Sequence, residues 1–266
     1  MHPILTIGVR AARKAGDYIV RNLDRISDLN IDEKSLNDYV SEVDRNAEQI
    51  IIETIHNSYP DHAILAEESG QQGESEYQWI IDPLDGTTNF LHGFPQFAVS
   101  IAVKHKEVIE QAIIYDPLRQ ELFTATRGDG AQLNNRKIRV SNRKELKGAL
   151  LGTGFPFGSN PDLEIFLNTF RAIFPVTSGI RRAGAASLDL AFVACGRLDG
   201  FWEFGLKEWD IAAGTLLIQE AGGMVSRIEH TEATQDRENI LCANPKIYSE
   251  MKKIIDSIIS DNSIDT

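Results

Sequence analysis

Two aspartates bracket a proline at the end of an apolar run in the segment WIIDPLDGTTNF, residues 79–90. Asp82 and Asp85 flank the dipeptide PL, and Gly86 and Thr87 follow directly. A carboxylate at the buried end of a strand is costly unless it is paired or bound to a cation. The placement of both side chains therefore predicts a positive partner in the folded protein.

The turn after the first aspartate could gather the ligands of such a cation. Pro83 fixes its own φ and favours an extended conformation for Asp82, so we expect the strand to end there. The turn can then bring both carboxylates and the backbone carbonyl of Leu84 to one side, and oxygen atoms are the ligands that Mg²⁺ prefers. If residues 86–89 open a helix, its free N–H groups form an anion site beside the metal. Metal-assisted hydrolysis of a phosphate ester requires a metal site directly beside a site that binds the phosphate.

An ordinary turn with an Asp N-cap is the alternative for DPLDG alone, because Asp, Pro and Gly are all turn formers. Two further segments favour the metal site. The segment ILAEES places Glu67 and Glu68 at the end of another short apolar strand, where we expect at least one of them to be solvated. The segment EWDIAAGTLLIQEAGG places Asp210 at the start of a helix, where an N-cap is its simplest role.

The elements that must position these carboxylates follow an order typical of a layered α+β protein. Apolar spacing predicts a first helix over residues 3–23 and a second helix with Ser41 as its N-cap. Residues 24–38 read as a polar connection or a short hairpin. Residues 97–135 read as three strands of an antiparallel meander. From about residue 148 onward, short strands alternate with longer helices.

Size and composition set further expectations. The 266 residues are 42% hydrophobic, and we expect one domain over residues 1–266, with an N-terminal half (1–147) that carries the aspartate motif and a C-terminal half (148–266). No apolar stretch approaches the length of a membrane span, and charges interrupt the first helix, which argues against a signal peptide. The two cysteines are too few for a disulfide framework or a zinc site, so we expect buried free thiols in a cytoplasmic protein.

The net charge of −12 limits the classes of partner. Non-specific nucleic-acid binding depends on basic patches, so this charge argues against direct binding of nucleic acid. An acidic protein that handles phosphates must also supply local positive potential, and a divalent metal is one way to do so.

Taken together, the three motifs resemble those of the inositol monophosphatase family of Mg²⁺-dependent, lithium-sensitive phosphatases. The segments WIIDPLDGTTNF and WDIAAGTLLIQEAGG match the two signatures of the family, and AEES matches its flanking metal-ligand motif. The opening MHPILTIGVRAARKAG and the length are most similar to the bacterial SuhB branch. The resemblance implies a layered α/β/α/β/α sandwich of the sugar-phosphatase type, and a homodimer.

The resemblance also implies a role for each motif residue. Two or three Mg²⁺ ions would be held by Glu67, Asp82, the Leu84 carbonyl, Asp85 and Asp210. Thr87 matches the residue that orients and deprotonates the attacking water together with Glu67, and the amides of Gly86 and Thr87 match the phosphate cradle.

Further residues are implied at the edges of the site. Lys34 and Asp44 match an auxiliary pair that lines it, although from the residues alone they read as a loop charge and a first-turn helix acid.

On the substrate side, a segment that contacts the sugar ring is matched by Arg181, Gly184, Ala185 and Ala186. Glu203 matches a carboxylate that accepts hydrogen bonds from ring hydroxyls, a role that suits ionised oxygens. The family often has Ser or Thr at the position of Ala185, so a hydroxyl contact to substrate is lost here. We expect Arg182 to be structural or interfacial rather than a ligand contact.

The expected function is hydrolysis of a phosphate monoester, inositol 1-phosphate, by direct attack of water. The same machinery could act on fructose 1,6-bisphosphate or a 3′-phosphonucleotide, because a shared fold does not decide the substrate. Similarity to the SuhB branch also implies a binding role in transcription antitermination and ribosome biogenesis, through transcription factors and RNA polymerase.

Overall fold

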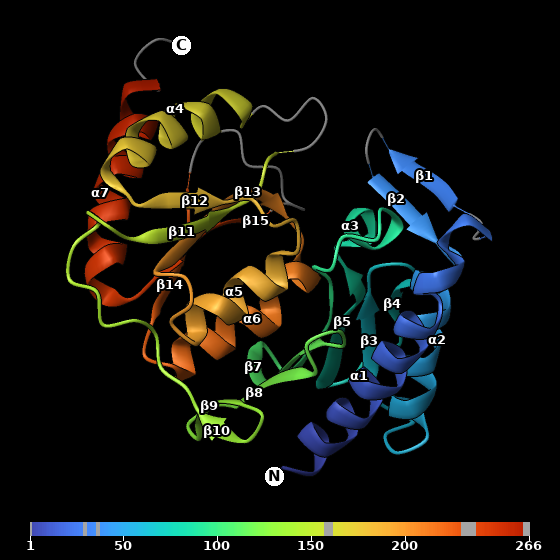
Figure 1. Ribbon diagram of the computed structural model, residues 1–266. Helices are drawn as coiled ribbons and strands as arrows, with labels where there is room; N and C mark the ends of the chain where they lie inside the picture. The colour runs from blue at the N-terminus through green and yellow to red at the C-terminus, as the bar shows by residue number, and fades with distance from the viewer. Residues whose placement is uncertain (1, 29–30, 36–37, 157–161, 230–237, 263–266) are drawn as a thin grey trace.

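Two helices, α5 (Ala186–Ala194) and α6 (Glu208–Glu220), lie between two β-sheets (Figure 1). The computed structural model describes residues 2–28, 31–35, 38–156, 162–229 and 238–262, and the side chains of these residues except those within 27–40 and 261–262. A layered α/β/α/β/α arrangement results, and it confirms the expected α+β class.

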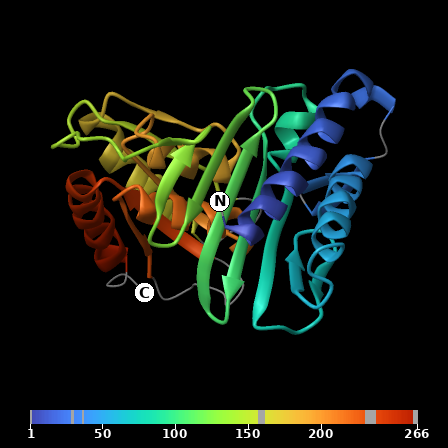
Figure 2. The same cartoon turned by 90° about the horizontal axis from the view of Figure 1, so that it is seen from below.

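The larger sheet, as far as it is described, has eight strands and is antiparallel except where β3 pairs with β5. In sheet order its strands are Arg136–Lys137 (β10), Gly130–Leu133 (β9), Glu121–Thr126 (β8), Val108–Asp116 (β7), Ala98–His105 (β6), Tyr77–Asp85 (β5), Ala63–Ala66 (β3) and Gly70–Gln72 (β4). Helices α1 (Pro3–Arg21) and α2 (Glu42–His56) cover one face, and the C-terminal half covers the other (Figure 2). The meander of β6, β7 and β8 confirms the expected strands of this region.

The smaller sheet belongs to the C-terminal half. In sheet order its described strands are Gly179–Arg181 (β12), Leu150–Thr153 (β11), Gly200–Leu206 (β13), Glu238–Ala243 (β15) and Met224–Arg227 (β14). Helices α4 (Leu163–Ile173) and α7 (Pro245–Asn262) pack together on its outer side.

Strand β5 shows how alternation along a buried strand joins the layers. Trp79 and Ile81 pack against α1 and α2, whereas Ile80, between them, packs in the core formed with α5 and α6. Successive side chains of a strand point to opposite faces, so a strand buried on both sides reads as the continuous apolar run seen here. At Gly214 of α6, a Cβ atom would lie 2.4 Å from a methyl carbon of Leu190, so these two helices approach closely.

The expected end of β5 at Asp82 is wrong, because the strand continues to Asp85. Asp82 pairs with Ser100 and Asp85 pairs with Ala98, so β5 has one more residue than β6 in this interval. A bulge of this kind leaves a residue outside the ladder, which is where a proline without an N–H can be accommodated. Both aspartates therefore belong to the strand, and the bulge between them changes the direction in which their side chains point.

Other boundaries differ by a few residues. The first helix ends at Arg21, a 3₁₀ helix covers Leu23–Asp28, and the hairpin alternative for the connection is confirmed by β1 (Ile31–Ser35) and β2 (Asp38–Ser41). Ser41 is the N-cap of α2, as expected. Asp210 is the third residue of α6 and not its N-cap, because the extended residue Lys207 occupies that position.

Both cysteines are free thiols, as expected, and Cys242 is buried whereas Cys195 is partly exposed. Among the described helices, none is both long enough and apolar enough to cross a membrane.

Candidate active site

The predicted acidic residues gather around the bulged end of β5. Asp82 and Asp85 are only 2% and 8% exposed. Burial raises the pKa of Asp82 well above its usual range, and the negative charges of Glu67, Asp85 and Asp210 raise it further. The structure thus brings these four side chains, from the β3–β4 turn, β5 and α6, within electrostatic reach of one another.

Asp210 reaches this cluster from the first turn of α6. Its Oδ2 accepts a hydrogen bond of 2.7 Å from the backbone N–H of Lys207. Burial raises the pKa of Asp210 well above its usual range, although this bond lowers it in part and Asp85 and Glu67 raise it further. The helix start therefore orients a carboxylate whose charged form needs compensation.

Thr87 and Asp44 form a second contact across the chain. The Thr87 hydroxyl donates to Oδ1 of Asp44 over 2.7 Å, and its oxygen also lies 3.1 Å from the Leu84 carbonyl oxygen. Oδ2 of Asp44 accepts from the backbone N–H and the hydroxyl of Ser41 at 2.9 and 2.6 Å. Asp44 is thus both the expected first-turn acid of α2 and the side chain that orients Thr87.

Gly86 shapes the turn that follows the aspartates. Its φ of 94° is left-handed, and it forms the N-cap of the short helix α3 (Thr87–Leu91). A Cβ atom at this position would lie 2.8 Å from the carbonyl oxygen of Gln96 and 3.3 Å from that of Gly184. Only glycine combines this φ with such a close approach of backbone.

Asn89, which the sequence did not single out, joins this turn to the substrate-side segment. Its Nδ2 lies within hydrogen-bond distance of three carbonyl oxygens, those of Gln96 (2.7 Å), Ala183 (2.9 Å) and Gly184 (3.0 Å). An amide inside the aspartate motif was the signal available in the sequence, but two of its three partners lie 94 and 95 residues away in the chain.

Ser187, in the first turn of α5, was also missed. Its backbone N–H donates to Oδ2 of Asp85 at 2.7 Å, and its hydroxyl donates to the same oxygen. Burial raises the pKa of Asp85, and the bonds from Ser187 partly offset that effect. Ala185, the N-cap of α5, has no side-chain acceptor, so Asp85 supplies one from another layer.

The substrate-side carboxylate Glu203 lies on β13 and is buried, with 7% exposure. Burial raises its pKa well above the usual range, Asp189 raises it further, and Arg182 lowers it in part. A Cβ atom at Gly154 would coincide with the Glu203 carboxylate, at 1.8 Å from Oε1, so this glycine makes room for the side chain. Asp189 of α5 is a further buried carboxylate, and none of the sequence motifs indicated it.

The two neighbouring arginines differ in their contacts. Arg181 is exposed, and its Nη1 donates to the carbonyl oxygen of Ile180 at 3.3 Å. Arg182 lies over the ring of Phe155 at 5.2 Å and is the arginine whose charge reaches Glu203. Lys34 lies on β1, and its side chain falls outside the described residues.

The donor set of the cluster fits a hard cation. In the described part of the chain, no three His, Cys, Asp or Glu side chains already stand in an arrangement that would hold a metal ion. Asp82 accepts instead from the Leu84 N–H at 3.0 Å, and Asp85 and Asp210 accept from the donors described above. A cation would share carboxylates with these donors. All candidate ligands are oxygen atoms, as Mg²⁺ prefers, and their mutual repulsion would be relieved by its charge.

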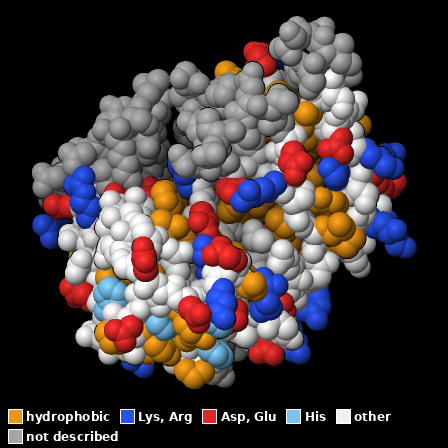
Figure 3. Space-filling view, turned by 180° about the vertical axis from the view of Figure 1, so that it is seen from behind, with side chains coloured by type: hydrophobic (Ala, Val, Ile, Leu, Met, Phe, Trp, Pro, Cys, Tyr) orange, Lys and Arg blue, Asp and Glu red, His pale blue; other side chains and the backbone are white. Residues whose placement is uncertain are grey.

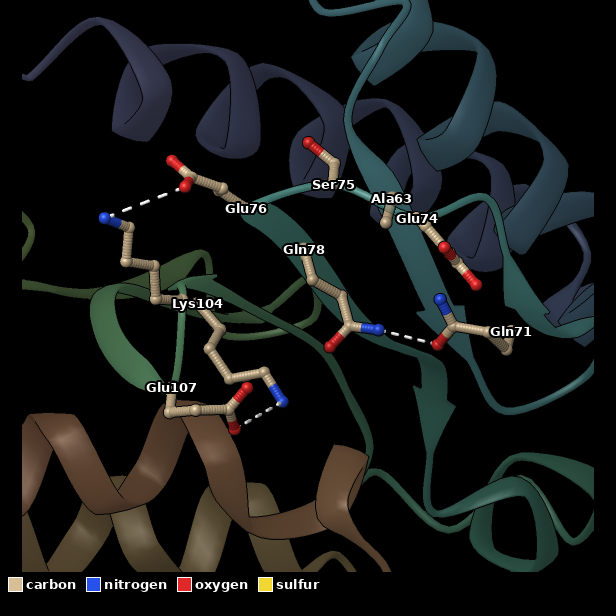
Figure 4. A pocket seen from close by; sticks show the side chains of 9 residues that line it. Ala63, Gln71, Glu74, Ser75, Glu76, Gln78, Lys104 and Glu107 are labelled. Carbon is tan, nitrogen blue, oxygen red and sulfur yellow. Dashed lines mark hydrogen bonds and ion pairs between the residues drawn. The ribbon is translucent and has the colours of Figure 1, made fainter.

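The open cavity of Figure 4, of about 430 Å³, is a different place. It lies near the start of β5, whereas the aspartates lie at the other end of this strand. Its two lysines already have acidic partners, since Lys106 lies 3.7 Å from Glu76 and Lys104 lies 3.3 Å from Glu208 and 4.0 Å from Glu107. We therefore place the candidate site at the carboxylates and not in this cavity.

Replacing Asp82 by Asn should flatten the pH dependence of stability when divalent cations are removed by a chelator. An acid whose pKa is raised on folding stabilises the fold below its ordinary value of 3.8, and this contribution is lost as the pH rises through the higher folded-state pKa. The measurement is the free energy of unfolding by urea between about pH 5 and about pH 8.

The control for this experiment is Asp256→Asn, which removes an exposed carboxylate paired with Lys252 on α7. It should leave the slope of stability against pH close to that of the wild type. A steeper or unchanged loss of stability in Asp82→Asn would contradict the repulsion within the cluster.

The chain is similar to known proteins over nearly its whole length. A model of the inositol monophosphatase family matches residues 1–260. The Nus factor SuhB of Pseudomonas aeruginosa is 55% identical over 257 residues, which cover 94% of this chain and 95% of that protein. The solved structure of the extragenic suppressor protein SuhB of Bartonella henselae is 43% identical, with a TM-score of 0.91, and covers 96% of this chain and 98% of that chain. The structure of the inositol monophosphatase of Anabaena (Nostoc) is 39% identical, with a TM-score of 0.83, over 95% of each chain. The chain therefore belongs to the inositol monophosphatase family.

Proposed function

We propose that the protein is a Mg²⁺-dependent phosphomonoesterase whose substrate is inositol 1-phosphate. The family is generally Mg²⁺-dependent. The observation that carries the proposal is the group of four acidic side chains at the end of β5. Asp82 and Asp85 are buried directly before the left-handed turn at Gly86, and the partly exposed Glu67 and Asp210 lie within electrostatic reach of Asp82. We take the whole chain to act as a single domain, because the core around α5 and α6 contains residues of both halves.

Two or three Mg²⁺ ions would be held by the carboxylates of Glu67, Asp82, Asp85 and Asp210 and by the Leu84 carbonyl. Bound Mg²⁺ lowers the pKa of a coordinated water and neutralises charge on the phosphate and on the leaving oxygen. The amides of Gly86 and Thr87 would bind phosphate oxygens where Gly86 permits close approach.

Thr87 is arranged to hold the attacking water. Its hydroxyl proton is directed to Asp44, so the lone pairs of its oxygen remain available to accept a hydrogen bond from water. Glu67 would take the proton that the water loses, and Lys34 would complete the auxiliary pair with Asp44. No covalent phosphoenzyme is required, because water itself attacks the phosphorus.

The substrate-side residues favour an uncharged polyol around the phosphate. Glu203 would accept hydrogen bonds from ring hydroxyls, and Arg181 and the segment Gly184–Ala186 would line the ring. The methyl group of Ala185 cannot donate a hydrogen bond, so contact with the substrate at this position would be made by backbone N–H and C=O groups. Asp189 and Glu203 line this side of the site with acidic side chains, which in either protonation state would not attract a second phosphate.

A partner role in transcription antitermination is the second candidate. The observation that favours it is the 55% identity to a protein named Nus factor SuhB, since Nus factors work with the transcription machinery. On the face shown in Figure 3, basic and acidic side chains are interspersed, which suits a protein partner better than direct RNA binding. The exposed pair of Arg182 and Phe155 is a candidate contact, either with such a partner or within a homodimer.

Phosphate release from inositol 1-phosphate should require Mg²⁺ and be inhibited by Li⁺. Asp210→Asn should lower kcat/KM by more than about a hundredfold, since loss of a ligand costs more than loss of its hydrogen-bond partner. Asp256→Asn serves as the control and should behave as the wild type.

Fructose 1,6-bisphosphate and a 3′-phosphonucleotide are measured in parallel. Faster hydrolysis of either compound would contradict the assignment of inositol 1-phosphate as the substrate. Unchanged phosphate release by Asp210→Asn would contradict the assignment of the active site.

Capture of transcription factors or RNA polymerase by the tagged protein tests the second role. Capture that survives in Asp82→Asn, which should not hydrolyse phosphate esters, would show that the two functions are separable. If Arg182→Ala no longer captured the partner, Arg182 would be part of the surface that contacts it. If the wild type retains neither factors nor polymerase, the partner role is excluded under those conditions.

A further inference from the structure

The buried hydroxyl of Ser187 donates its hydrogen bond to Asp85, a carboxylate of the candidate site. Ser187 is fully buried in the first turn of α5. Its Oγ and its backbone N–H both donate to Oδ2 of Asp85, 102 residues earlier in the chain. Two donors on one oxygen, one of them a rigid helix amide, restrict rotation of the carboxylate about its last torsion.

The arrangement also meets a need of the helix. The first N–H groups of a helix have no partner within it and are usually capped by the N-cap side chain. Ala185, the N-cap of α5, offers no oxygen, and no side-chain cap bond is made there. The carboxylate of Asp85 takes that place from the opposite half of the molecule, so α5 and the bulged end of β5 hold each other.

Asp85 needs such a restraint because its neighbours repel it. It lies in the same bulge as Asp82, and its negative charge raises the pKa of both Asp82 and Asp210. Without fixed donors, a buried carboxylate beside like charges can rotate away from them. This rotation would remove an oxygen ligand from the place where a divalent cation is expected.

We propose that Ser187 is a positioning residue for cation binding, which holds the Asp85 carboxylate in its ligating orientation through the Oγ–H bond. This inference rests on the proposed function in that it takes Asp85 as a ligand. Ser187 would not touch the substrate or the cation, and its effect would be transmitted through Asp85 alone.

The test is equilibrium binding of Mn²⁺ without substrate, followed by electron paramagnetic resonance, because Mn²⁺ accepts the same oxygen ligands as Mg²⁺. Ser187→Ala should weaken Mn²⁺ binding by about tenfold, as is typical when the hydrogen-bond partner of a ligand is removed. The Mg²⁺ concentration for half-maximal phosphate release should rise by the same factor, while kcat at saturating Mg²⁺ should remain close to that of the wild type.

Matched variants separate positioning from folding. Ser226 lies on β14, at the opposite edge of the smaller sheet from β12, and its hydroxyl accepts a 2.7 Å hydrogen bond from Tyr248. Ser226→Ala removes this hydroxyl and should leave Mn²⁺ binding unchanged. Ser187→Cys retains the volume but donates weakly, so it should resemble Ser187→Ala. Thermal unfolding in chelator reports the structural contribution of each variant.

Distinct results bear on each claim. A lower melting temperature of Ser187→Ala in chelator with unchanged Mn²⁺ affinity would overturn the proposal and leave Ser187 as a helix-packing residue. Wild-type protein that binds Mn²⁺ but releases no phosphate would overturn the proposed function and not the role of Ser187. Wild-type protein that binds no Mn²⁺ would overturn both.

Discussion

Repulsion among buried carboxylates is the constraint on which the site depends. Asp82, Asp85 and Asp210 lie in a region where burial alone raises the pKa of each. Such a group is stable only if protons, hydrogen-bond donors or a cation offset its charge. The protein supplies donors from backbone and from Ser187, and a divalent cation would supply the remainder. With a cation bound, the carboxylates that otherwise repel one another would serve as its ligands.

The carboxylates are carried and held by elements from different layers, so the site depends on the layered fold. The bulge in β5 carries Asp82 and Asp85, and the first turn of α6 carries Asp210. The start of α5 holds Asp85, while Asn89 of α3 lies against the carbonyls that precede α5. The site is therefore a junction between the two halves, and movement of α5 relative to β5 would change the ligands and the substrate segment together.

Local signals in the sequence were sufficient for the elements and for the acidic motif, but not for the links between them. The apolar run of β5 and the N-cap at Ser41 follow from patterns within a few residues, and both elements are found in the structure. The passage of β5 through Pro83 depends on its register with β6, which a proline rule cannot supply. The bonds from Thr87 to Asp44 and from Ser187 to Asp85 join residues 43 and 102 positions apart, so no local pattern indicates them.

The central claim is that this cluster of carboxylates binds a divalent cation. Anomalous scattering from a crystal of the wild-type protein soaked in Mn²⁺ tests it directly, because the signal locates the ion without reference to activity. The account predicts an anomalous peak bounded by the carboxylate oxygens of Asp82 and Asp85, with Glu67 or Asp210 adjacent to it. The account would be contradicted if Mn²⁺ peaks appeared at surface sites of the soaked crystal but none appeared among these side chains, with the carboxylates still bonded only to the donors described here.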